Sequence, residues 1–201
     1  MRRTLIIILS LVLLLLMLPC RRVSDHDMRW SLHKGDLVWI VDTQIRRGDI
    51  VSLYNPLDKN EKILRRAIAG PGQSLDYDKN GSLRIDGKRV RQKDMGRKED
   101  HRPERVRVLE ENIWSKAPQK GEAALSYSWL LQRRMGVNHW SLEEPVTLGD
   151  NEWFLMADRR DHAIDSRWWG PISEDDIEGV VRLRAGSSDV WRNSIQILSP
   201  P

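Results

Sequence analysis

The sequence predicts a mostly β protein with small α content, in which one domain follows an N-terminal transmembrane helix. Short runs rich in aliphatic and β-branched residues occur at 37–41, 50–53, 63–68, 83–85, 153–156 and 177–183. Turn sequences that contain glycine lie before or between them, at 34–36, 47–49, 80–81, 86–87 and 149–150. This alternation is typical of hairpins in a β-rich fold. With 201 residues, the chain is long enough for an anchor and one domain with a buried core.

The anchor is predicted from the apolar run at residues 4–20, in which only Thr4 and Ser10 are polar. Its length is slightly below the about 20 residues that usually span a bilayer. Two arginines flank the run on each side, at positions 2, 3, 21 and 22. The residues before Cys20 are Met, Leu and Pro, which lack the small-x-small pattern of a cleaved signal peptide. We therefore predict an uncleaved membrane anchor over residues 1–22 and a domain over residues 23–201.

Cys20 leaves one alternative for the N-terminal segment. A lipoprotein would carry its lipid on this cysteine, but Pro19 is a poor fit to the small residue that such processing requires. Cys20 is the only cysteine, so an intramolecular disulfide is impossible. Because the flanking arginines are balanced, only the free amino terminus favours an orientation with the N-terminus inside. The domain is then expected on the outer side.

The charge distribution argues against nucleic acid as a partner. The formal net charge is +4, and the four arginines that flank the apolar run account for it. The rest of the chain holds 29 basic and 29 acidic side chains, so it has no general attraction for phosphate backbones. The basic stretch at 84–107 contains interspersed acidic residues and is interpreted as a solvated face.

The β pattern breaks down between about residues 88 and 145. This part of the sequence is highly charged and is interpreted as a variable insertion in the domain. Within it, apolar residues alternate with polar ones over 122–135, and we expect a helix there. No internal repeat is present.

The most specific motif covers residues 158–170, which read Asp-Arg-Arg-Asp-His-Ala-Ile-Asp-Ser-Arg-Trp-Trp-Gly. This block resembles a motif of the type I signal peptidase family, the bacterial leader peptidases of the serine/lysine type. Three more blocks, at 27–36, 48–56 and 65–73, are similar to family motifs and follow the family order. The resemblance implies a signal-peptidase-like β-barrel or sandwich domain on the extracytoplasmic side of the cytoplasmic (inner) membrane. It also implies that exported or membrane-bound polypeptides and the lipid bilayer are the partners.

The departures from the family pattern fall on the positions that carry its chemistry. Asp27 stands at the position of the serine nucleophile, and Arg65 at that of the lysine general base. Asp25 occupies a position that in many members helps to bind the oxyanion, and Ala163 replaces the serine that orients the lysine. The charged residues that brace the site in the family are retained, at Arg66, Asp158, Asp165 and Arg167.

These replacements predict a loss of the family's proteolysis. A Ser/Lys dyad requires a neutral amine to take the hydroxyl proton, whereas the guanidinium of Arg65 stays protonated. Asp27 and Arg65 are expected to form an ion pair instead. We therefore expect a proteolytically inactive protein of the signal peptidase I type, which binds exported polypeptides or helps to process or assemble them.

Two alternatives remain open at this point. The chain can be an active serine endopeptidase of the same type with a relocated nucleophile, for which Ser31 and Ser24 are the candidates. It can also be a structural component of a secretion or surface-assembly complex. No cofactor and no metal are expected, because the histidines lack the spacing of a ligand set.

Overall fold

The structure is a computed structural model. It describes residues 20–29, 31–79, 81–99, 105–114, 126–134, 142, 144–161, 163–186 and 195–197. Residues 1–19, which hold most of the predicted anchor, lie outside these ranges. Among the described residues, no helix is long and apolar enough to cross a bilayer.

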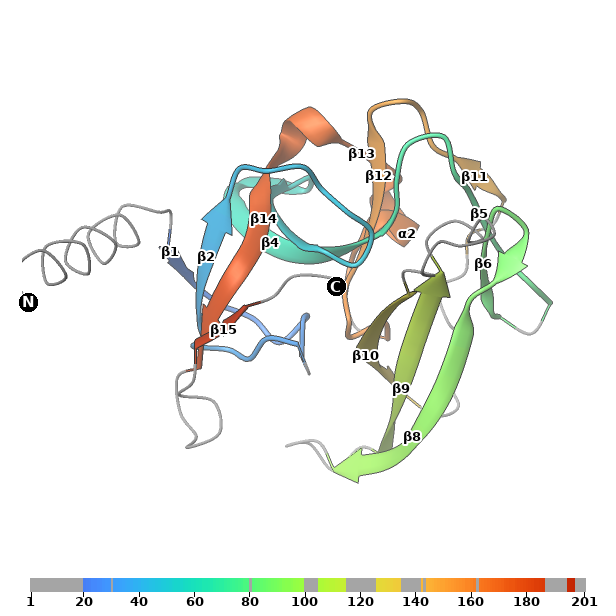
Figure 1. Cartoon of the computed structure of the whole chain (residues 1–201), viewed down its shortest axis with the longest axis horizontal. Coiled ribbons are helices and arrows are strands. Elements are labelled where there is room, and N and C mark those ends of the chain that lie inside the picture. The colour runs from blue at the N-terminus through green and yellow to red at the C-terminus, as the bar shows by residue number, and fades with distance from the viewer. Residues whose placement is uncertain are drawn as a thin grey trace, which may run out of the picture.

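The main sheet contains eight strands in the described part of the chain (Figure 1). Its strand order is β1-β2-β14-β3-β4-β12-β13, and β15 pairs with β14. All of these pairs are antiparallel. The strands are β1 (Cys20–Arg22), β2 (Leu37–Val41), β3 (Ile50–Asn55), β4 (Asp58–Ala69), β12 (Glu152–Met156), β13 (Ile172–Ser173), β14 (Ile177–Ala185) and β15 (Ile195–Ile197).

β4 positions the candidate site because it is long and changes partners along its length. Its residues 58–66 pair with β3, and its residues 66–69 pair with β12. Figure 1 shows β4 bending across the molecule between these two neighbours. The first half of β4 therefore has a strand on one side only, as far as the described residues show.

Apolar side chains from both faces of this curved sheet form the core. One cluster includes Met28, Leu32 and Leu64, and a second includes Leu53, Ile63 and Leu155. These side chains are almost completely buried. In β2, buried positions alternate with partly exposed ones, which is the pattern of a strand with one face on a core.

A four-stranded sheet in the order β11-β5-β6-β7 covers a third apolar cluster. Its strands are β5 (Ser74–Tyr77), β6 (Leu83–Ile85), β7 (Lys88–Arg89) and β11 (Val146–Thr147). The Asp-Gly pair predicted to form a hairpin turn does so between β6 and β7. Asp86 has φ 51° and Gly87 has φ 72°, which are the positive values that a type I′ turn requires.

The region around 88–145 forms β structure where the structure describes it. β8 (Arg91–Glu99), β9 (Arg105–Trp114) and β10 (Ser126–Arg134) make an antiparallel three-stranded sheet. The helix expected over 122–135 is therefore wrong, because β10 occupies most of that range. Aromatic and aliphatic residues at positions 127, 129 and 131 are compatible with a strand, and pairing with β9 makes this segment one.

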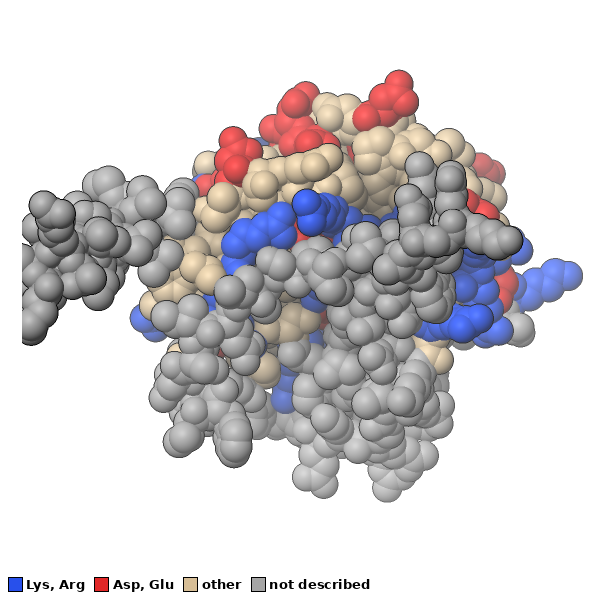
Figure 2. Space-filling view, viewed as in Figure 1, with Lys and Arg blue, Asp and Glu red and all other residues tan. Residues whose placement is uncertain are grey.

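The prediction of a mostly β fold with small α content is confirmed. Among the described residues, α-helix is confined to the short α2 (Ser166–Trp169), and a 3-10 turn, η1 (Glu174–Asp176), leads into β14. Figure 2 shows acidic side chains along the upper edge of this view and basic side chains in a band across its middle. The balanced charge of the domain is thus unevenly distributed over this face.

Candidate functional site

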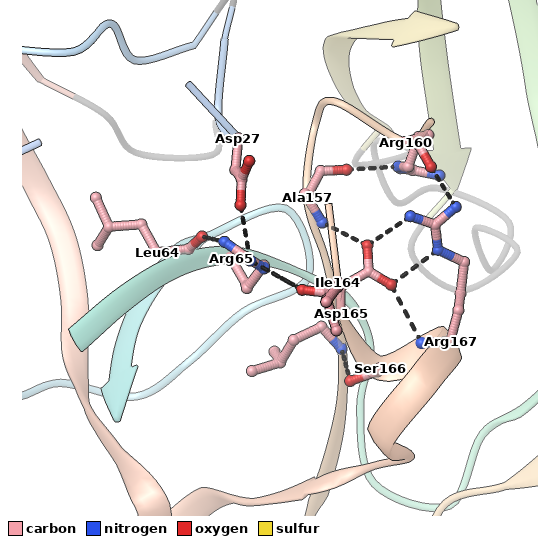
Figure 3. A network of polar contacts seen from close by, with 10 residues as sticks. Asp27, Leu64, Arg65, Ala157, Arg160, Ile164, Asp165, Ser166 and Arg167 are labelled. Carbon is pink, nitrogen blue, oxygen red and sulfur yellow. Dashed lines mark hydrogen bonds and ion pairs between the residues drawn. The ribbon is translucent and has the colours of Figure 1, made fainter. Parts of the chain in front are cut away.

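An ion pair joins the two residues at the centre of the site. Arg65 lies on β4, and Asp27 lies in the segment that follows β1. Nη2 of Arg65 is 2.9 Å from Oδ2 of Asp27 (Figure 3). The side chain of Arg65 is only 4% exposed, and that of Asp27 is 28% exposed. The ion pair expected from the sequence is therefore present, and one of its partners is buried.

Arg65 is held by three further hydrogen bonds to backbone carbonyls. Its Nε and Nη2 donate to the carbonyl oxygen of Ile164, at 3.2 and 2.8 Å, and its Nη1 donates to that of Leu64 at 2.7 Å (Figure 3). The guanidinium carbon also lies 5.8 Å from the ring centroid of Trp169, within the range of a cation–π contact. A guanidinium has five N–H donors, so the chain itself occupies nearly all of them.

The other two expected site residues lie beside this pair. Oδ1 of Asp25 accepts a hydrogen bond from the backbone N–H of Asp27 at 2.9 Å. Ala163 packs against the apolar cluster that contains Met28 and Leu32, and it immediately precedes Ile164, whose carbonyl binds Arg65. The structure thus gathers Asp25, Asp27 and Arg65 through direct contacts and brings Ala163 close through its neighbour in the chain.

The carboxyl group of Asp27 has an unusual environment for an ion-paired aspartate. Burial raises its pKa above the ordinary value, and the nearby charge of Asp25 adds to this effect, whereas Arg65 opposes it. The folded chain therefore binds a proton at Asp27 more tightly than the unfolded chain does. Consequently, this group's contribution to stability is complete at low pH and is lost as the pH rises through the folded-state pKa.

Asp27→Asn is expected to remove this pH dependence. The quantity to compare is the difference in the free energy of unfolding between the wild type and the variant. This difference should become smaller as the pH rises from the ordinary aspartate range through the folded-state pKa of Asp27. The substitution also leaves Arg65 without its carboxylate, which lowers the free energy of unfolding by an amount that does not depend on pH. The pH dependence of the difference is measured separately from this constant amount. Denaturant titrations at a series of acidic pH values measure it, and a difference curve that rises with pH would contradict the assignment.

A second, more deeply buried ion pair supports the neighbouring position on β4. Arg66 forms a bidentate pair with Asp158, in which Nε–Oδ1 is 2.7 Å and Nη2–Oδ2 is 2.6 Å. Nη2 of Arg66 also donates to Oγ of Ser31 at 2.6 Å, and this hydroxyl donates to Oδ2 of Asp158 at 2.5 Å. Nη1 of Arg66 donates to the carbonyl oxygen of Gly48. Four segments of the chain are therefore fixed to one another at this point.

The third ion pair holds the loop after β12 in shape. Asp165 accepts from Nε and Nη2 of Arg167 at 2.8 and 2.7 Å, and also from the backbone N–H of Ala157 at 3.0 Å (Figure 3). Asp165 additionally caps α2. Arg160 donates to the carbonyl oxygen of Ala157, and Arg167 donates to that of Arg160. This network fixes the loop whose Ile164 carbonyl binds Arg65.

The two candidate relocated nucleophiles have different surroundings. The hydroxyl of Ser31 is engaged between Arg66 and Asp158, as described above, and neither is an amine or an imidazole that could take its proton. Ser24 is exposed. Partial burial, together with the charge of Lys34, lowers the pKa of His26, which is two residues along the chain from Ser24.

No metal centre is evident in the described part of the chain, where no group of three or more His, Cys, Asp or Glu side chains is placed to hold an ion. His162, in the loop before α2, lies outside the described residues. The polar groups at the site are instead arranged as Arg–Asp pairs.

Sequence reasoning missed two contributors to the site. The carbonyl of Ile164 is one, and its role has no sequence signal because any residue offers a carbonyl group. Ser31 is the other: the sequence names it only as a candidate nucleophile, and its hydrogen bonds to Arg66 and Asp158 were not predicted. These bonds join distant segments of the chain, so no local signal in the sequence marks them.

Comparison with known proteins identifies relatives over most of the chain. Signal peptidase I of Pseudomonas aeruginosa is 25% identical over 172 residues, which cover 82% of this chain and 56% of the relative. Signal peptidase I of Bacillus amyloliquefaciens is 26% identical over 167 residues, covering 80% of this chain and 70% of the relative. The chain thus matches just over half the length of the Pseudomonas protein.

A crystal structure of a signal peptidase I from Enterococcus faecalis V583 is also similar, with a TM-score of 0.40 and 18% identity. It covers 70% of this chain and 98% of the other. The model of the family described as "Signal peptidase, peptidase S26" matches residues 1–185. This match covers far more than half of the sequence, and the chain therefore belongs to the signal peptidase family, peptidase S26.

Proposed function

We propose that this protein is a membrane-anchored, non-catalytic signal peptidase homologue that binds exported or membrane-bound polypeptides at the outer face of the cytoplasmic membrane. The observation that carries the proposal is the ion pair between the buried Arg65 and the partly exposed Asp27. By resemblance, these residues stand where the family has its general base and its nucleophile. The guanidinium of Arg65 is hydrogen-bonded to other groups of the same chain, so these side chains fill the site and are not arranged for reaction.

The chemistry of the replacements argues against peptide-bond cleavage. The guanidinium of Arg65 keeps its proton at any accessible pH and cannot activate a nucleophile. The carboxylate of Asp27 is a weak nucleophile toward an amide, and its pair with Arg65 weakens it further. Asp25 adds negative charge where an oxyanion would develop, which opposes the transition state. Ala163 has no hydroxyl with which to orient a base.

The retained framework supports a binding role for the same region. The first half of β4, residues 58–65, pairs only with β3 among the described residues. Its other edge has backbone groups available for an added strand, which is a common way to bind an extended polypeptide. One exposed apolar side chain adjoins β4: Ile164 is 46% exposed, and its carbonyl oxygen binds Arg65. Together the edge and this side chain offer a backbone template and apolar contact area.

The alternative function is that of an active signal peptidase I-type serine endopeptidase. It is favoured by the names of the relatives, which are called signal peptidase I. Ser24 is the better candidate nucleophile in that case, because Ser31 is bound between Arg66 and Asp158, whereas Ser24 is exposed. Incubation of the purified wild-type chain with a preprotein separates the two functions.

Hydrogen exchange tests the binding role. A synthetic peptide with an apolar run followed by a short extended segment is added to the detergent-solubilised full chain. Amide exchange in residues 58–65 is expected to slow, because the added strand would protect the open edge of β4. The β6–β7 hairpin serves as an internal control and should be unchanged. If amide exchange slowed nowhere, or slowed equally in all segments, binding at this edge would be contradicted.

A further inference from the structure

The turn between β3 and β4 exposes two large apolar side chains. Leu57, at the tip, is 60% exposed, and Tyr54, just before it, is 46% exposed. The turn itself is stabilised by the side chain of Asn55, which accepts a hydrogen bond from the N–H of Leu57 at 3.0 Å. Tight turns favour Gly, Pro, Asn, Asp and Ser for conformational reasons, and none of these reasons applies to leucine. Leu57 and Tyr54 therefore give this end of the hairpin an exposed apolar surface.

Strand register places this tip at the end of the sheet where the chain enters β1. Cys20, the first residue of β1, pairs with Trp39 in the middle of β2, and Arg22 pairs with Leu37, so the chain enters β1 from the side of the C-terminal end of β2. Val41, the last residue of β2, pairs with Val180 of β14, which also pairs with Val51 of β3. β3 then continues past this level to the turn. The predicted anchor and the hairpin tip therefore extend from the same end of the sheet.

A polar network fixes the hairpin relative to the first residues after the anchor. Nη1 of Arg21, in β1, donates to Oγ of Ser52 at 3.1 Å, and this hydroxyl donates to Glu178 at 2.8 Å. Nζ of Lys62 is 2.6 Å from the same carboxylate and 4.9 Å from the ring centroid of Tyr54. The distance from the membrane junction to the hairpin is thus set by the folded domain.

We propose that the β3–β4 hairpin is a second membrane contact, in which Leu57 and Tyr54 enter the interfacial layer of the bilayer that holds the anchor. The inference rests on the anchor of the proposed function. Two apolar side chains alone would bind a membrane weakly, but a tethered contact gains from a high effective concentration. Tyrosine is also enriched at membrane–water interfaces, where its ring is buried and its hydroxyl stays hydrated.

Charge does not attract this hairpin to anionic lipid. Asp58 and Glu61 balance Lys59 and Lys62 within it, and η1, which leads into the neighbouring β14, is entirely acidic. The acidic upper edge in Figure 2 agrees with this distribution. The contact is therefore apolar, and it should form on zwitterionic phosphatidylcholine vesicles without added anionic lipid.

Fluorescence quenching in such vesicles tests the proposal with the full-length chain. An environment-sensitive fluorophore is attached at position 57 in a Leu57→Cys, Cys20→Ser variant, and spin-labelled phospholipid with its nitroxide near the ester end of the acyl chain serves as quencher. A matched variant, Lys88→Cys with Cys20→Ser, carries the probe on the exposed β6–β7 hairpin. Wild-type Cys20, which is exposed, carries the probe at the predicted membrane junction.

Quenching at position 57 is expected to exceed that at position 88 at least about twofold, because interfacial side chains lie about 5–10 Å within the headgroup region. It should not increase when phosphatidylglycerol replaces part of the phosphatidylcholine. Strong quenching at Cys20 with equal, weak quenching at positions 57 and 88 would overturn the hairpin contact while leaving the anchor intact. Weak quenching at all three positions would overturn both, and quenching at 57 without quenching at Cys20 would support the hairpin and reject the anchor.

Discussion

Asp158→Ala is expected to lower the free energy of unfolding by about 3–5 kcal/mol, because it leaves the buried Arg66 without its carboxylate. The side chains of this pair are 0% and 7% exposed, respectively, and they make two short hydrogen bonds. The same substitution also removes the acceptor for the Ser31 hydroxyl. Denaturant unfolding of the full chain in detergent measures the loss.

Asp76→Ala is the matched control for this prediction. Asp76 also forms a bidentate pair, with Arg84, but the side chains are 25% and 40% exposed. Solvent screens such a pair, so its loss should destabilise the chain far less than the loss of the Asp158 pair. Equal effects of the two substitutions would show that the Asp158 pair is not the brace that the structure indicates.

Asp27→Ser combined with Arg65→Lys is expected to give at most trace cleavage of a preprotein. The lysine would lose most of the four hydrogen bonds that hold Arg65, because an ammonium lacks the planar fork of a guanidinium. Asp25 would remain next to the nucleophile, with its Oδ1 2.9 Å from the backbone nitrogen of residue 27. Restoring two side chains therefore leaves the electrostatics of the site unsuitable for an oxyanion.

Adding Asp25→Ser and Ala163→Ser to this variant should raise cleavage further, by about 100-fold or more if each recovers one hydrogen bond to the transition state. The gain of the four changes together should exceed the product of the separate gains, because the residues act as a unit. Cleavage is measured by the mobility shift of the preprotein, and Arg65→Lys alone serves as the control. A two-residue variant as active as the four-residue one would mean that Asp25 and Ala163 do not limit the site.

The parts of this molecule that the sequence predicts well are those with dense local signals. The Asp-Gly turn at 86–87 required positive φ values, and it has them. The pairing of Asp27 with Arg65 followed from the motif alignment, because the resemblance assigns both positions to one site, and the ion pair is present. The four braces followed for the same reason.

Other features depend on tertiary contacts that a sequence does not encode locally. The carbonyl of Ile164 reaches Arg65 only because β4 and the loop after β12 lie side by side. The strand β10 was mistaken for a helix because short apolar patterns fit both periods, and pairing with β9 decides between them. The sequence around Leu57 shows a turn, because Asn55 and Pro56 precede it, but it does not show that no other segment covers this leucine.

The site is proposed to bind polypeptides without cutting them, and incubation of the purified wild-type chain with a preprotein tests this. The preprotein is expected to keep its signal peptide however long the incubation, while an intact signal peptidase I from Pseudomonas aeruginosa removes it in parallel. Cleavage by the wild-type chain that is abolished by Ser24→Ala or Ser31→Ala would instead show an active serine endopeptidase with a relocated nucleophile.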